Sequence, residues 1–72
     1  MTVVTKSRIR GSFHGWTGDG IYVLENGQLW QQVRYRYRYR YKYRPRATVL
    51  RRGGKHFLEV DGMREAIEVR RA

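Results

Sequence analysis

The stretch that decides the fold is residues 33–44, which read VRYRYRYRYKYR. Tyrosine and a basic residue alternate there with a strict period of two. Side chains of a β-strand alternate between two faces, whereas the helical period would scatter both residue types around every side. The tract therefore predicts a strand with one tyrosine face and one cationic face. The tyrosines are Tyr35, Tyr37, Tyr39, Tyr41 and Tyr43.

A straight strand from Gln28 to Arg44 would be too long for a small domain. About 17 residues at about 3.3 Å each span roughly 55 Å, whereas a domain of this size has an expected radius of gyration of about 11 Å. The strand must either bend sharply and serve two sheets or project as an exposed ribbon. Pro45 cannot donate to a central ladder, so we expect the strand to end there.

Glycine-containing dipeptides predict tight turns around this tract. Asn26-Gly27, Gly53-Gly54 and Asp61-Gly62 are flanked by β-branched or aromatic residues, as in β-hairpins. A two-residue turn at Asn26-Gly27 predicts the pairs Leu24–Leu29, Val23–Trp30 and Tyr22–Gln31. The same turn at Gly53-Gly54 predicts the pairs Ala47–Val60, Val49–Leu58 and Leu50–Phe57.

The remaining segments predict further short strands. Alternation favours strands over 8–13 and 67–70, a loop over 15–20 and a helical turn over 63–66. We expect residues 1–6 to fray. Five or six short strands with no room for a helix predict an all-β fold, a small and strongly bent SH3-like barrel.

Length and composition limit the alternatives. The 72 residues can form one small domain, residues 1–72, and the absence of cysteine excludes disulfides and thiolate zinc sites. A hydrophobic content of 40% is too high for intrinsic disorder. No apolar run is long enough for a signal peptide or a transmembrane helix, so we expect a cytoplasmic protein.

Most of the positive charge lies in the tract. The chain carries 16 Lys and Arg against 6 Asp and Glu, a net charge of +10. Seven of the positive residues lie between positions 34 and 46, with no acidic residue among them. They are Arg34, Arg36, Arg38, Arg40, Lys42, Arg44 and Arg46. A cationic row of this density repels itself and gains from an anionic partner.

Two interpretations of the tract stay open. In the first, the seven cations bind phosphates while Tyr37, Tyr39 and Tyr41 stack on unpaired bases. In the second, the tyrosines form a buried core row and the arginines are the solvated outer face of a structural strand. Both hold in part if the tyrosines face inward, because the arginines still reach phosphates.

We predict a non-catalytic module that binds RNA or single-stranded DNA with low sequence selectivity. The alternative is a protein interaction or self-assembly module, with a homodimer through the exposed strand edge and a merely solubilising basic face. Binding to an anionic membrane surface ranks third.

Catalytic, metal and cofactor sites are not predicted. His14, Asp19, His56 and Glu59 show no diagnostic spacing, and two histidines are too few for a structural metal site without carboxylates. Trp16 and Trp30 fit core positions better than exposed platforms.

Three segments carry a resemblance to a known group of proteins. These are FHGWTG at 13–18, LENGQLWQQ at 24–32 and the tyrosine and basic alternation into Pro45. In these segments the chain resembles a group of small bacterial proteins without an assigned activity, over about Phe13 to Arg70. The resemblance implies an SH3-like barrel and carries over no functional residue.

Overall fold

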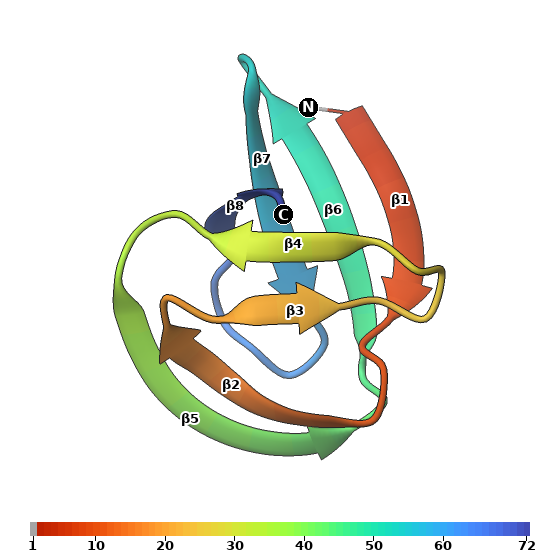
Figure 1. Cartoon of the computed structure of the whole chain (residues 1–72), viewed down its shortest axis with the longest axis vertical. Coiled ribbons are helices and arrows are strands. Elements are labelled where there is room, and N and C mark those ends of the chain that lie inside the picture. Colours follow the sequence, from red (N-terminus) through yellow and green to blue (C-terminus); the bar gives the residue numbers. More distant parts are fainter. Residues whose placement is uncertain (1) are drawn as a thin grey trace.

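The computed structural model describes residues 2–72, which form eight β-strands and no helix (Figure 1). The strands are β1 (Thr2–Arg8), β2 (Ser12–Gly18), β3 (Ile21–Val23), β4 (Leu29–Gln32), β5 (Arg36–Tyr43), β6 (Arg46–Arg52), β7 (Lys55–Val60) and β8 (Ile67–Arg71). Six strands form one antiparallel sheet in the order β1-β6-β7-β8-β4-β3, and β2 pairs with β5 in a second sheet. The predicted all-β fold is confirmed.

The predicted SH3-like barrel is not confirmed, because the six-stranded sheet is not closed. Its edge strands β1 and β3 are joined only by an isolated bridge between Ile9 and Leu24. The strand number also exceeds the predicted five or six. The chain leaves the main sheet after β4, and β5 then pairs with β2 as a separate curved ribbon on the outside of the molecule (Figure 1).

The N-terminal predictions need correction. Residues 2–6, which we expected to fray, belong to β1 and pair with β6 from Thr2 opposite Arg51 onward. The valines and threonines at positions 2–5 have high β-propensity, which favours this edge strand. The single strand expected over 8–13 is interrupted, because Gly11 has a φ of 68° and turns the chain from β1 into β2.

The first hairpin differs from its predicted register by one residue. Val23 pairs with Leu29 and Tyr22 with Trp30. The turn has three residues, since Gly27 alone has positive φ and its N–H donates to the Leu24 carbonyl at 3.0 Å. A type I′ turn would also require positive φ at Asn26. Asn26 instead accepts a side-chain hydrogen bond from the Gln28 N–H.

The second hairpin has the predicted register. Gly53 and Gly54 both have positive φ, as a type I′ turn requires, and Val49 pairs with Leu58. The Asp61-Gly62 pair makes a tight corner, in which the Met63 N–H donates to the Val60 carbonyl at 2.9 Å. The helical turn expected over 63–66 is not formed, and those residues run as an irregular link into β8.

The core lies between the main sheet and the inner face of the ribbon. From β2, Phe13 and Trp16 are buried and meet Tyr22 of β3 in edge-to-face and tilted ring contacts at 5.6 to 6.2 Å. Trp30 is also buried, in tilted contact with His56. Both tryptophans are therefore core residues, as predicted, although Trp30 lies opposite Tyr22 and not Val23.

Gln32 determines where the tract leaves the main sheet. Its buried carboxamide donates from Nε2 to the carbonyls of Arg34 and Arg36, at 2.9 and 3.0 Å. Its Oε1 accepts the Tyr22 hydroxyl at 2.9 Å, and that hydroxyl accepts the Thr17 N–H of β2. This side chain thus satisfies two carbonyls of the bend between β4 and β5. It also connects the bend to β3 directly and to β2 through the Tyr22 hydroxyl.

We expect Gln32→Glu to destabilise the fold by about 1–3 kcal/mol, because a carboxylate cannot donate to the two carbonyls of the bend. Urea unfolding followed by tryptophan fluorescence measures this change. The matched control is Gln31→Glu in the same strand, where the side chain only accepts a long hydrogen bond from Arg70. An equal loss in both variants would contradict the role assigned to Gln32.

Candidate nucleic-acid interface

Strand β5 is exposed on both faces and along one edge. It pairs with β2 on one side, and no other strand among residues 2–72 pairs with its second edge. The five tyrosines of the tract have exposed fractions from 54% to 80%. The arginines of β5 are exposed as well, and only Lys42 is partly buried. This strand is the most open element of the described fold.

The pairing register shows which face each row occupies. Arg38 lies opposite buried Trp16, and Lys42 lies opposite buried Phe13. Directly paired residues of antiparallel strands share a face, so the basic row lies on the core side of the ribbon. Tyr37 lies opposite exposed Thr17 on the other side. The tyrosine row therefore points away from the core.

The interpretation of the tyrosines as a buried core row is wrong. The core beneath the ribbon is filled by Phe13 and Trp16 of β2, so the β5 side chains are not needed there. The predicted stacking residues Tyr37, Tyr39 and Tyr41 are all free to contact a partner. Sequence reasoning also missed His14, whose ring lies 5.5 Å from the Tyr41 ring and 6.3 Å from the Tyr39 ring.

We call Tyr37, Tyr39, Tyr41, Tyr43 and His14 the tyrosine face. Tyr35 precedes β5, and its ring lies against Gly18, so it is not included.

A β-bulge lets both strands of the ribbon keep their inward residues. Between the pairs Phe13–Lys42 and Trp16–Arg38, β5 has one more residue than β2. Gly15 absorbs the mismatch with a φ of 90°. A Cβ at this position would lie 2.0 Å from the Arg38 carbonyl oxygen. Only glycine allows the two backbones to approach this closely.

We expect Gly15→Ala to destabilise the protein more than Gly27→Ala. Both glycines have a φ near 90°, which costs alanine about 1–2 kcal/mol, but Gly27 has no atom within 4 Å of the added methyl. The clash at Gly15 adds about 1–3 kcal/mol, the usual cost of overpacking. Urea unfolding measures both variants, and equal losses would contradict the close approach at Gly15.

Three of the seven predicted phosphate-binding cations are paired with carboxylates. The Arg34 Nε atom lies 3.4 Å from a Glu68 oxygen, and the Arg36 Nη1 atom lies 2.5 Å from a Glu65 oxygen. Arg44 forms two hydrogen bonds to Glu25, one of them 3.0 Å long. These ion pairs connect the ends of β5 to the main sheet and its loops. They also reduce the net positive charge that a bound anion would meet there.

The other four predicted cations lack such a partner among residues 2–72. They are Arg38, Arg40, Lys42 and Arg46. Arg38 and Arg40 belong to the middle of β5, where they alternate with the residues of the tyrosine face and point to the opposite side of the strand. The Lys42 side chain lies against Gly62. A Cβ added at Gly62 would lie 2.6 Å from the end of the Lys42 side chain. Arg46 belongs to β6, so the seven cations do not form one continuous face.

Arg44 has a structural role that its place in the repeat did not predict. It follows β5, has a φ of 49°, and its backbone N–H donates to the Gly11 carbonyl at 2.9 Å. The hydrogen bond from Arg44 lowers the pKa of Glu25 below its ordinary value of 4.5, against the opposing effect of burial. The charges of Arg44, Arg8 and Arg10 lower this pKa further, and the pair raises the pKa of Arg44.

The Glu25 pair predicts a defined pH dependence. Because the pKa of Glu25 is lower in the folded state, its stabilising effect is present at neutral pH and is lost as pH falls through the folded pKa, below 4.5. We expect wild type to exceed Glu25→Gln in thermal midpoint at pH 7, and we expect the two midpoints to converge as pH falls through the folded pKa of Glu25. A gap that widens in acid would contradict the pairing.

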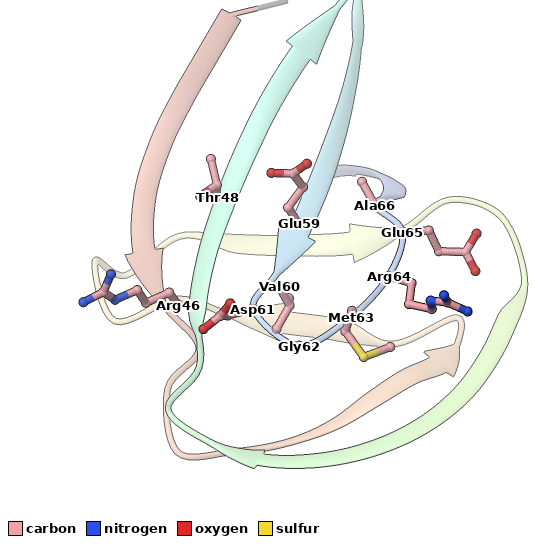
Figure 2. A pocket seen from close by; sticks show the side chains of 10 residues that line it. All are labelled: Arg46, Thr48, Glu59, Val60, Asp61, Gly62, Met63, Arg64, Glu65 and Ala66. Atoms are coloured by element: carbon pink, nitrogen blue, oxygen red, sulfur yellow. The ribbon is translucent and has the colours of Figure 1, made fainter.

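The surface depression drawn in Figure 2 does not form an alternative anion site. It has a volume of about 360 Å³ and lies between the 61–66 link and side chains of β6 and β7. Its lining includes Glu59, Asp61 and Glu65 beside two arginines, Arg46 and Arg64. Because acidic and basic side chains are mixed there, the depression is not a positively charged binding site.

Other classes of site receive no support from the described part of the chain. Among residues 2–72, no three histidine or acidic side chains lie together as a metal-binding group. His14 lies on the tyrosine face and His56 beside Trp30, so they do not meet. The same residues include no helix long and apolar enough to cross a membrane.

Comparison with protein-family models gave no match. Searches of curated proteins and of solved structures likewise gave no significant match. The geometry of the ribbon therefore carries the functional argument alone.

Proposed function

We propose that this protein binds RNA or single-stranded DNA with low sequence selectivity through the ribbon formed by β2 and β5. The observation that carries the proposal is the exposure of the tyrosine row on the outside of the fold. Aromatic rings beside unpaired arginines are the combination that single-strand binding surfaces use, since rings stack on bases and guanidinium groups bind phosphates. The protein needs no cofactor and no catalytic residue for this role.

The exposed rings support a binding role better than a structural one. A row of exposed aromatic side chains is unusual on a soluble monomer and marks an interaction surface. Base stacking on an aromatic side chain contributes about 1–3 kcal/mol per base and tolerates every base. Phosphate contacts from Arg38 and Arg40 position a strand without reading its sequence. Both contributions favour affinity without selectivity.

Self-assembly through the free edge of β5 is the competing function, and the backbone directions count against it. The Arg38 carbonyl and the Arg40 amide nitrogen lie against Gly15 of β2, and the Arg44 N–H donates to Gly11 just before β2. Backbone groups of successive residues alternate between the two edges, so those of Tyr37 and Tyr39 lie at the free edge. An antiparallel copy must pair through these residues, which places arginine opposite arginine. Like charges directly opposed destabilise a strand pair.

We expect the triple variant Tyr37→Thr, Tyr39→Thr, Tyr41→Thr to lose at least tenfold in affinity for a fluorescent single-stranded oligonucleotide, measured by anisotropy. Threonine keeps the β-propensity and removes the rings, and losing even one stacked base at about 1–3 kcal/mol accounts for this change. The matched control is the triple phenylalanine variant, which keeps the rings and should bind like wild type. Equal binding by all three proteins would contradict stacking.

A salt series tests the phosphate contacts separately. With two to four unpaired cations in contact, log K against log salt should have a slope of about −1.4 to −2.8, using about −0.7 per contact with a single strand. Replacing Arg38 and Arg40 by alanine should make this slope shallower by about 1.4. An unchanged slope would exclude those two side chains from phosphate binding.

A further inference from the structure

The free edge of β5 carries backbone acceptors as well as donors. The Arg38 carbonyl and the Arg40 amide nitrogen lie against β2. Because backbone groups of successive residues alternate between the two edges of a strand, Tyr37 and Tyr39 each direct one N–H and one carbonyl toward the free edge. The exposed arginines Arg38 and Arg40 alternate with them along the strand. A polyanion that follows the edge finds amide and guanidinium donors for its phosphates. The two carbonyl oxygens need a donor from the ligand.

The type of nucleic acid decides whether these carbonyls are satisfied. The sugar and phosphate groups of DNA offer no hydrogen-bond donor, whereas each ribose offers a 2′-hydroxyl that can donate. A carbonyl that loses water and gains no donor lowers the affinity. A strand lying along this edge is therefore favoured when it is RNA.

The spacing of the rings decides between single strands and duplexes. Alternate residues of a β-strand are separated by about 6.6 Å, from about 3.3 Å per residue. Successive bases in one strand of a duplex are only about 3.4 Å apart, and they are already stacked on each other. A duplex cannot place one base on each tyrosine. An extended strand with separated bases matches the ring spacing of Tyr37, Tyr39 and Tyr41.

We infer that the ligand of the ribbon is extended single-stranded RNA, with its sugar–phosphate backbone along the free edge of β5 and its bases over the tyrosine face. The 2′-hydroxyls donate to the edge carbonyls of Tyr37 and Tyr39, and Arg38 and Arg40 reach around the edge to the phosphates. This inference rests on the proposed function and narrows it to one polymer and one conformation.

The test uses the full chain and five fluorescent probes of equal length and, for the nucleic acids, equal sequence. They are single-stranded RNA, single-stranded DNA, 2′-fluoro RNA, an RNA duplex and polyglutamate as a polyanion without rings or hydroxyls. The 2′-fluoro strand keeps the RNA sugar but cannot donate a hydrogen bond. Anisotropy at one salt concentration gives each affinity.

We expect single-stranded RNA to bind at least fivefold more tightly than DNA or the 2′-fluoro strand, the effect of about one net hydrogen bond. The duplex and polyglutamate should bind at least tenfold more weakly than single-stranded RNA, because neither offers unpaired bases to the rings.

Four results would overturn the inference. Equal binding of single-stranded RNA and DNA, with both weakened in the threonine triple variant, would leave the proposed function intact and remove the role of the 2′-hydroxyls. A duplex that binds as tightly as the single strand would exclude the extended conformation. Polyglutamate binding as tightly as RNA, or no binding of any nucleic acid, would also contradict the proposed function.

Discussion

The carboxamide of Gln32 is the contact on which the rest of the arrangement depends. It bonds two carbonyls of the bend after β4 and the hydroxyl of Tyr22, which in turn accepts a hydrogen bond from β2. A buried side chain with all of these partners satisfied favours a single chain path. Because the chain turns here, the alternating tract enters a second sheet and the main sheet continues without it.

The exposure of the tyrosines follows from that turn. In the ribbon, the inward positions that matter for the core belong to β2, where Phe13 and Trp16 fill the space above Tyr22. Strand β5 is then held by the backbone ladder, by the bulge at Gly15 and by ion pairs at its ends. None of these contacts uses a tyrosine ring. The fold thus leaves the rings available at no cost to the core.

The sequence predicted the elements of this structure better than their orientation. The strand predicted from the alternating tract and the turn predicted from Gly53-Gly54 both agree with the structure, because both depend on local backbone preferences. The alternation could not show which row faces the core, because exchanging the two faces leaves the pattern unchanged. Asn26-Gly27 was assigned the wrong turn, since the dipeptide allows two loop lengths. His14 and Glu65 gave no local signal, because their partners are distant in sequence. The role of Gln32 depends on the bend that brings the Arg34 and Arg36 carbonyls to its side chain, and the alternating pattern did not show that bend.

The ion pairs divide the basic tract into two parts with different roles. Glu68, Glu65 and Glu25 pair with arginines at the beginning and end of the tract, while the middle of β5 keeps Arg38 and Arg40 unpaired beside the outward rings. Exposed pairs of this kind contribute little to stability individually. Within β5 they leave Arg38, Arg40 and Lys42 without a carboxylate partner among residues 2–72, in the stretch where the aromatic rings are free. A basic composition alone does not show which cations form ion pairs within the fold and which can bind a ligand. Because the paired arginines lie at the ends of the tract, we expect the ligand to bind at the middle of β5.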